Sequence, residues 1–520
     1  MNSSPGLNLA PVRLICRVGP ALPVVLWLIP ASLLGLFMVG AGNVFPDEGW
    51  YLYAARLVSE GQVPYRDFAY LQAPLAPYIF APFRGDFLAT RLFCLTLGLV
   101  SIGLMLSLSH REGPWALLVS AGLLVFSGYT MRWLVITRNI SPAVCFIALG
   151  FFTFRPDDSR RLALAGIFFA LATATRTSAL GFVVALGLIS LIGWTSNEQE
   201  SKESPQDALT RIFWATIPAA VTLLVTFGTH LALDPSNFYF CNLGYHTGLH
   251  DSSVTIGSHV VAKIQNLFRF NDKHLLVTLC GLVGIWGVGF EWKRWRTAMA
   301  QEPRIALVSL GAALVTILHL IPGRLHPEYH ELILLPVAWL VAHMIQVCIR
   351  EKWILTPTRR VVGTFLILST AQVLGVSGHI WMNKGWCHAD LQRLAQRVEK
   401  HLTPDSPLFT FVPDLALIAH RDLMPGLEMA SVSLAAPGLE SGEVRDHHML
   451  NLQHIKDAFE NRRPGVVVWA DLEDADSRRV GLYPSEEIRS VQRALKTGYR
   501  PVETQGLWTI WIRRLTPSIP

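Results

Sequence analysis

Long apolar runs, separated by short polar connections, dominate the chain up to about residue 380. The first run, Ala21 to Gly42, is long enough for a hydrocarbon core ~30 Å thick, which a helix of about 20 residues crosses. Similar runs follow at 88–109, 114–131, 139–154, 161–175, 178–194, 211–232, 274–290, 304–322, 329–349 and 361–380. The pattern predicts an α-helical polytopic membrane protein with about 11 transmembrane helices.

The pattern changes after the last of these runs. Helix-like periodicity in CHADLQRLAQRVEKHL, HIKDAFENRR and PSEEIRSVQRAL alternates with strand-like segments at LFTFV, GVVVWAD, 499–504 and 507–513. Strands that alternate with helices are typical of a small α/β domain. The sequence therefore predicts a transmembrane domain at 1–380 and a C-terminal α/β domain at 381–520.

Lysine and arginine residues gather in four of the polar connections, which the positive-inside rule places in the cytoplasm. These groups are Arg13 and Arg17, then Arg155, Arg160 and Arg161, then Lys293, Arg294 and Arg296, and finally Arg350, Lys352, Arg359 and Arg360. All four groups share one side only if 161–194 crosses the membrane twice. The loops 43–87, 233–273 and 323–328 then face outward, together with everything after about residue 380. We expect a multi-pass protein of the cell (inner) membrane with an extracytoplasmic C-terminal domain.

The composition agrees with this architecture. Hydrophobic residues make up 51% of the chain, charged residues 16%, and the mean hydropathy of +0.37 does not suit a soluble protein of 520 residues. A net charge of +6 and a pI near 9.0 are explained by the basic connections, so we expect membrane lipids and no nucleic acid as partners. The 7 cysteines show no spacing that indicates a metal site or a disulfide.

Two adjacent carboxylates, Asp47 and Glu48, follow the first apolar run in FPDEGWYLYAARLVSEGQVPYRDFAYLQAPLAPYIF. At the outer mouth of a membrane helix a carboxylate is partly desolvated and still reached by water, which suits a general base. The alternative is that both residues only cap a following helix. That helix has Trp50, Tyr51, Ala54, Leu57 and Val58 at helical spacing, which predicts an amphipathic helix in the interface plane.

This stretch resembles the GT-C superfamily, in the branch of protein O-mannosyltransferases and lipid A aminoarabinose transferases (glycosyltransferase family 39 type). The resemblance rests on the acidic pair, on WYLYAARLVSEGQVPYRDF and on the proline-rich APLAPYIF, and it covers about the first 350 residues. It implies an inverting transfer from a polyprenyl-phosphate sugar donor, with Asp47 as the catalytic base and Glu48 as its support. Many relatives carry a further acidic residue where this chain has Arg138 and Asn139, a departure that argues against a two-carboxylate metal site.

Basic residues at outward helix ends are candidates for the donor phosphate. Arg138 offers a planar donor fork for a phosphate or a sugar hydroxyl, unless it only reaches from the interface to water. Arg176 lies between two apolar runs, where relatives often have lysine, and it contacts phosphate or forms a structural ion pair. In IPGRLHPEYH, the residues Arg324, His326 and Tyr329 supply positive charge and donors for a departing phosphate, or else form an ordinary interfacial belt.

The acceptor cleft is predicted between the loops 43–87 and 233–273, with Tyr65 and Asp67 as candidate residues. His246 and His250 in YHTGLHD have the spacing of a divalent-cation pair, but Gly248 weakens the helix between them, so we expect no metal and no cofactor. Phosphate-binding glycine loops and nucleophile elbows are missing from the sequence.

Transfer of a sugar to a lipid, glycan or protein acceptor is the preferred function. The alternative is a transporter or flippase of lipid-linked saccharides without catalytic activity.

Overall fold

The computed structural model describes residues 22–41, 43–45, 47–192, 205–248, 261, 265, 302–320, 327–350, 387–402, 406–434, 441–470, 485–506 and 508–514. The helical body contains the α-helices α2 (Leu22–Ala41), α3 (Glu48–Ser59), α4 (Leu75–Phe80), α5 (Phe87–Glu112), α6 (Pro114–Val125), α7 (Gly128–Val135), α8 (Ile140–Thr153), α9 (Ser159–Thr175), α10 (Leu180–Ile192), α11 (Pro205–Leu223), α12 (Thr229–Leu233), α13 (Pro235–Tyr239), α14 (Tyr245–Gly248), α18 (Pro303–Leu320) and α19 (Glu331–Arg350). Short 3-10 or π segments lie at η1 (Ala81–Phe83), η2 (Thr177–Ala179), η3 (Leu224–Gly228), η4 (Phe240–Gly244) and η5 (Pro327–His330).

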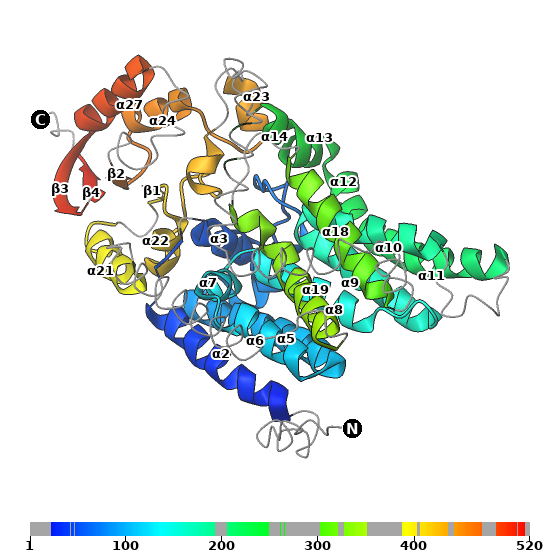
Figure 1. Cartoon of the computed structure of the whole chain (residues 1–520). Coiled ribbons are helices and arrows are strands. Elements are labelled where there is room, and N and C mark those ends of the chain that lie inside the picture. Colours follow the sequence, from blue (N-terminus) through cyan, green and yellow to red (C-terminus); the bar gives the residue numbers. More distant parts are fainter. Residues whose placement is uncertain are drawn as a thin grey trace, which may run out of the picture.

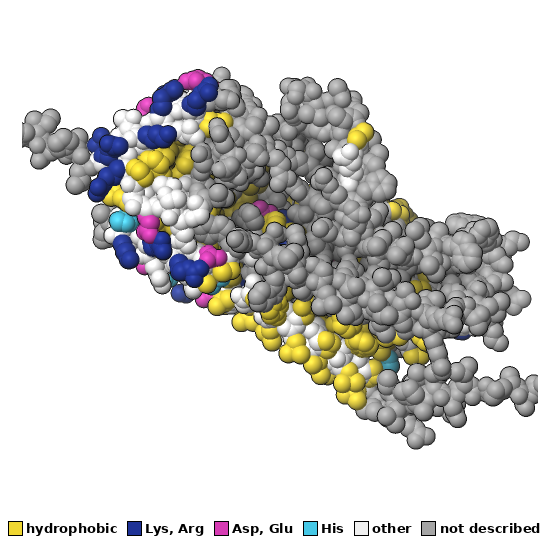
Figure 2. Space-filling model, turned by 60° about the vertical axis from the view of Figure 1, so that its left-hand side comes forward, with side chains coloured by type: hydrophobic (Ala, Val, Ile, Leu, Met, Phe, Trp, Pro, Cys, Tyr) yellow, Lys and Arg dark blue, Asp and Glu magenta, His cyan; other side chains and the backbone are white. Residues whose placement is uncertain are grey.

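Among the described residues, three helical stretches are long and apolar enough to cross a membrane: Leu22–Ala41, Phe87–Glu112 and Gln206–Leu233. Shorter apolar helices cover most of the other predicted spans, while 274–290 and 361–380 lie outside the described residues. The count of 11 spans therefore stays a prediction. On the face seen in Figure 2, hydrophobic side chains of the helical body are exposed at the surface, whereas charged side chains gather on the C-terminal part.

Local sequence signals set the helix ends. Asp86 begins α5 by accepting a hydrogen bond from the Ala89 N–H at 2.7 Å, and Gly113, with φ of +145°, ends it directly before Pro114. The predicted span 114–131 is two helices instead of one, because α7 begins afresh at its N-cap Ser127. In the 161–194 region, α9 and α10 are separate helices divided by η2, and the two membrane crossings predicted for this region stay a prediction.

The described residues of the C-terminal part form a mixed sheet of four strands, in the order β1-β2-β4-β3. β1 (Leu408–Thr410) and β2 (Val466–Ala470) are parallel, and β4 (Trp508–Arg513) is antiparallel to both β2 and β3 (Tyr499–Gln505). The accompanying elements are α21 (His388–Glu399), α22 (Pro413–Ile418), η6 (Ala430–Ser433), α23 (Ser441–Asp446), α24 (Leu452–Glu460) and α27 (Ser485–Gly498). All four strands occur where the alternation of strand-like and helix-like segments predicted them.

Helix α3 lies between the helical body and the C-terminal part (Figure 1). The sequence pattern predicted an amphipathic helix in the interface plane, and its place relative to a membrane stays a prediction. Nine of its 12 residues are buried, because α22 packs on one side of α3 while α4 and η1 pack on another. The C-terminal part therefore touches the helix that begins beside Asp47.

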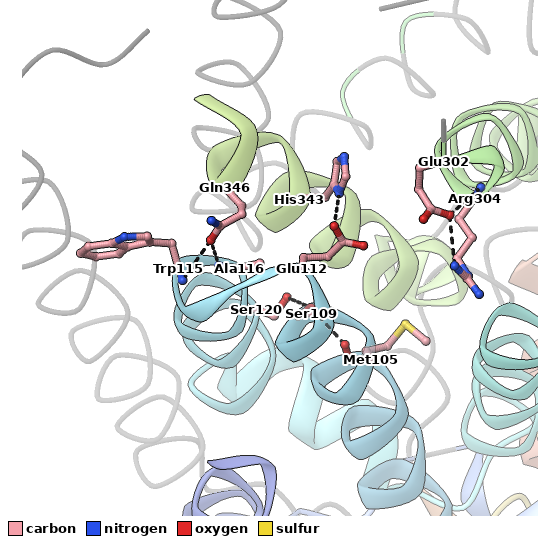
Figure 3. Close-up of polar contacts among 10 residues, drawn as sticks. All are labelled: Met105, Ser109, Glu112, Trp115, Ala116, Ser120, Glu302, Arg304, His343 and Gln346. Carbon is pink, nitrogen blue, oxygen red and sulfur yellow. Dashed lines mark hydrogen bonds and ion pairs between the residues drawn. The ribbon is translucent and has the colours of Figure 1, made fainter. Parts of the chain in front are cut away.

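A polar cluster at the opposite end of the helical body ties α5, α6 and α19 together (Figure 3). The Gln346 amide oxygen accepts hydrogen bonds from the N–H groups of Trp115 and Ala116 at 3.2 Å, which satisfies two orphan donors at the start of α6. His343 Nδ1 lies 3.0 Å from a carboxylate oxygen of Glu112. The contacts drawn there are hydrogen bonds and ion pairs between neighbouring helices, which hold this end of the helical body together.

Candidate active site

Asp47 precedes the first residue of α3 but does not cap the helix. Its side chain makes no capping hydrogen bond, and Oδ2 lies 2.8 Å from Arg138 Nη2. The Asp47 side chain is 29% exposed, whereas that of Arg138 is only 6% exposed. A buried guanidinium therefore orients a carboxylate that remains within reach of solvent.

Glu48, the next residue, lies in a fully buried position. Its Oε1 accepts hydrogen bonds from Arg91 Nε and the Thr137 N–H, both at 2.9 Å. Its Oε2 accepts from Arg91 Nη2 at 2.5 Å and from the Phe45 N–H at 2.9 Å. Four donors fill the acceptor capacity of a carboxylate, and they offset the cost of burying its charge. Glu48 thus anchors the start of α3 and has no oxygen left for a substrate.

Arg91 is the residue of this site that sequence reasoning missed. It lies in the second turn of α5, and besides Glu48 it reaches the carbonyl oxygens of Asn43 at 2.9 Å and Val39 at 3.3 Å. Its guanidinium also lies 4.3 Å from the centre of the Phe87 ring. A lone charge inside an apolar run was the available signal, because such a charge is costly unless it is paired.

Arg138 and Arg176 come to the site from different helix ends. Arg138 follows α7, and its guanidinium lies about 5 Å from the rings of Phe45 and Trp133. Arg176 ends α9 in an extended conformation, with a φ of −148°, and only 7% of the residue is exposed. Its guanidinium lies 4.5 Å from the centre of the Tyr329 ring.

Asn139 links the elements that carry these arginines. Its Oδ1 accepts a hydrogen bond from Arg176 Nη1 at 3.0 Å, and its Nδ2 donates to the Thr175 carbonyl at 3.3 Å. The same nitrogen donates to Gln72 Oε1 at 3.2 Å. The turn before α8, the end of α9 and the loop after α3 therefore meet at one point.

Tyr51 lies one helical turn after Asp47, and the same charged groups surround it. The charges of Arg138, Arg176 and Asp47 all act on its phenol, as does Tyr329. Burial raises the pKa of Tyr51 well above its usual range, so the phenol keeps its proton. Only 1% of the residue is exposed, and its hydroxyl has no hydrogen-bond partner among the described residues. Buried polar groups are normally paired, so this hydroxyl indicates a place for a ligand atom.

No family model matches the chain, and no curated protein sequence matches it. Its structure is similar to ArnT from Cupriavidus metallidurans in the apo state, with a TM-score of 0.57 and 15% identity over 94% of this chain and 97% of ArnT. For ArnT bound to undecaprenyl phosphate the TM-score is 0.58 and the identity 14%, with the same coverage. The Archaeoglobus fulgidus oligosaccharyltransferase gives a TM-score of 0.52 and 12% identity, over 92% of this chain and 73% of that protein. Both neighbours are GT-C glycosyltransferases. This chain has the GT-C fold.

The GT-C fold brings four of the residues predicted from the sequence into one cluster. Asp47 pairs with Arg138, and the Arg176 guanidinium lies over the Tyr329 ring. The Tyr51 phenol interacts electrostatically with all four of these residues. Glu48 lies behind them in its own ion pair. Arg324 and His326 lie outside the described residues.

Tyr65 and Asp67, the candidates for the acceptor cleft, are engaged elsewhere in the loop after α3. The Tyr65 hydroxyl donates to the Gln72 carbonyl at 2.5 Å, and its buried ring packs on His230. Asp67 pairs with its neighbour Arg66 at 2.8 Å. No described contact joins either residue to Asp47, so their part in acceptor binding stays a prediction.

The histidine pair considered for a cation is only partly described. His246 Nε2 lies 3.2 Å from the Leu71 carbonyl oxygen, while His250 and Asp251 fall outside the described residues. Within the described ranges, no group of three His, Cys, Asp or Glu side chains is placed to hold a metal ion. On this GT-C fold the described cluster offers a proton acceptor, two guanidinium groups and a phenol, which suit the binding of an oxyanion beside a reacting hydroxyl.

Proposed function

We propose that this chain transfers a sugar from a polyprenyl-phosphate donor to an acceptor at the outer face of the membrane. The acceptor hydroxyl gives its proton to Asp47, its oxygen attacks the anomeric carbon, and the bond from that carbon to the phosphate oxygen breaks. The polyprenyl phosphate leaves with the bonding electron pair. A single displacement of this kind inverts the anomeric configuration, because the base and the leaving group lie on opposite faces of the sugar.

One observation carries the proposal: a partly exposed carboxylate pairs with the buried guanidinium of Arg138, and these two charges, together with that of the buried Arg176, act on the unpartnered phenol of Tyr51. Arg138 orients Asp47, and we assign Arg176 and Tyr51 to contacts with the oxygens of the departing phosphate. Charge-assisted donors aimed at developing negative charge are a large source of rate enhancement. The structure of ArnT bound to undecaprenyl phosphate has the same fold and supports the assignment of the donor class.

The C-terminal part is proposed to cover the acceptor side of the site, outside the membrane. The Leu423 N–H donates to the Tyr53 hydroxyl at 2.9 Å, and Arg56 Nη1 donates to the Arg421 carbonyl at 3.2 Å. Both Tyr53 and Arg56 belong to α3, so this part of the chain and the base share one support. Cysteine labelling in intact cells is expected to place Tyr70 and Asp446 outside and Asp207 in the cytoplasm. A cytoplasmic Asp446 would contradict the proposed topology.

The direct test is an activity measurement with the full-length protein in nanodiscs. Radiolabelled polyprenyl-phosphate hexoses and pentoses are supplied singly, with cell-envelope extract as the source of acceptors. The proposal predicts label transfer to one class of acceptor, release of polyprenyl phosphate, and an inverted anomeric configuration by NMR. Transfer is expected to continue in EDTA, because no cofactor is proposed. Retention of configuration would contradict the single displacement, and transport of the donor without transfer would favour a flippase.

A further inference from the structure

His319 occupies a buried place behind the arginine cluster, and the proposed reaction leaves it without a role. It belongs to the last turn of α18, and only 3% of the residue is exposed. Its Nε2 lies 2.7 Å from Ser178 Oγ, in the η2 segment that directly follows Arg176. One side of the imidazole therefore joins α18 to the break between α9 and α10.

The other contacts of His319 lead towards the candidate phosphate site. Its ring centre lies 5.4 Å from that of Tyr329 and 5.6 Å from that of His330. Tyr329 in turn lies beneath the Arg176 guanidinium, whose charge also acts on His319. The imidazole thus packs next to Tyr329, which itself contacts the Arg176 guanidinium.

The second ring nitrogen of His319, Nδ1, is buried and has no hydrogen-bond partner among the described residues. A neutral imidazole has one donor nitrogen and one acceptor nitrogen. If the Ser178 hydroxyl donates to Nε2, Nδ1 carries the proton and can donate to an anion. A buried donor beside a guanidinium and a phenol suits a phosphate oxygen.

We propose that His319 is a further donor-binding residue, whose Nδ1–H hydrogen-bonds to a phosphate oxygen of the polyprenyl phosphate. Ser178 would be its positioning residue, because the hydrogen bond at Nε2 selects the required tautomer. This inference rests on the proposed function. The same contact serves the donor before transfer and the lipid phosphate after it, so free undecaprenyl phosphate is a sufficient probe.

Two amide substitutions separate this role from a structural one. In His319→Asn the amide N–H takes the place of Nδ1, while the contact with Ser178 is lost. In His319→Gln the amide reaches the place of Nε2, which keeps the Ser178 contact and removes the Nδ1 donor. A purely structural role predicts that glutamine is the better substitute, and the proposed role predicts asparagine.

The measurement is the affinity of the full-length protein in nanodiscs for undecaprenyl phosphate, with the melting temperature of each variant recorded. We expect His319→Gln to bind about 10- to 100-fold more weakly, the effect of one hydrogen bond to a charged group, and His319→Asn to stay within about threefold of wild type. His343→Gln is the matched control, since it changes a half-buried histidine at the opposite end of the helical body and should leave affinity unchanged.

The opposite order, equal losses in both variants, or no loss in either would overturn the assignment of His319. Arg176→Gln distinguishes this failure from failure of the proposed function. If wild type binds the probe and Arg176→Gln weakens binding while the His319 variants do not, only the inference about His319 fails. If wild type neither binds undecaprenyl phosphate nor transfers a sugar, the proposed function itself fails.

Discussion

Asp47 and Glu48 are adjacent in the chain and carry the same charge, but their surroundings are opposite. The Glu48 carboxylate is fully buried and accepts four hydrogen bonds from Arg91 and two backbone N–H groups. The Asp47 side chain is 29% exposed and pairs with Arg138, near the unpartnered hydroxyl of Tyr51. A carboxylate with every acceptor position filled stabilises the fold, whereas a partly exposed carboxylate beside an unpartnered phenol is available for chemistry.

The two ends of the helical body repeat this contrast. At the end drawn in Figure 3, Glu112 pairs with His343, Arg304 pairs with Glu302, and Gln346 accepts from two backbone N–H groups. At the other end, Tyr51 and His319 each have a buried polar atom without a partner among the described residues. Unsatisfied buried groups are costly, so a protein retains them where a ligand completes them.

The largest expected effect comes from breaking the buried ion pair. In Glu48→Gln the Arg91 charge loses its counterion, and removing one partner of a buried pair costs about 3–5 kcal/mol. The expected result is a low yield of monodisperse protein and a clearly lower melting temperature. Arg155→Gln, which changes an exposed arginine, is the control and should behave as wild type. A Glu48→Gln protein as stable as wild type would contradict the anchoring role of Glu48.

The next variant is expected to lower activity without lowering stability. Tyr51→Phe removes a hydroxyl that has no partner among the described residues, so the melting temperature should stay the same or rise slightly. If the hydroxyl binds the departing phosphate, kcat/KM for the donor should fall about 10- to 100-fold, the effect of one hydrogen bond to a charged group. Unchanged transfer kinetics in Tyr51→Phe would show that the hydroxyl does not touch the reacting groups.

A smaller effect is expected at Gly49, where α22 touches the beginning of α3. A Cβ at Gly49 would come within 2.7 Å of the Asp414 backbone nitrogen, so Gly49→Ala forces the two helices apart. Overpacking of this kind costs about 1–3 kcal/mol. Gly40→Ala in α2 is the matched control, because its Cβ would meet no atom within 4 Å. Equal melting temperatures for the two variants would show that the contact between α3 and α22 is loose.

A further effect, which appears only as the pH is raised, comes from Asp414, a third carboxyl group near Glu48. Burial and then the Glu48 charge raise the pKa of Asp414 to about 8, whereas in the unfolded chain its pKa is ~3.9. Since folding favours the protonated form, this group destabilises the protein increasingly as the pH rises from about 4 to 8. Asp414→Asn should match wild type near pH 4 and melt progressively higher than wild type as the pH rises to about 8.

The exposed Asp446→Asn variant is the control for this pH series and should follow wild type throughout. Parallel pH profiles for wild type and Asp414→Asn would show that Asp414 is already ionised in the folded protein.

Much of the cluster around Asp47 was predictable, since a carboxylate and several arginines at outward helix ends need only topology to bring them together. The partner of Glu48 was not, because Arg91 lies 43 residues away in an apolar helix and only packing brings the two together. The burial of α3 was missed for the same kind of reason. Tyr53 and Arg56 of this helix form hydrogen bonds to the loop at 421–423, which lies more than 360 residues away in the sequence. Hydrophobic periodicity predicts a helix and its apolar face. It cannot predict which distant segment of the chain packs on the other faces of that helix.

The most direct test of the central claim, that Asp47 reacts while Glu48 only holds α3 in place, is the single-turnover transfer rate per folded molecule. Asp47→Asn and Glu48→Gln are compared with prebound donor, each rate divided by the amount of monodisperse protein. Loss of a general base costs roughly 10² to 10⁴ in rate, so Asp47→Asn should be slower by this factor at normal yield. Glu48→Gln should give little folded protein, but each folded molecule should react within about tenfold of the wild-type rate. A wild-type rate in Asp47→Asn would contradict the account.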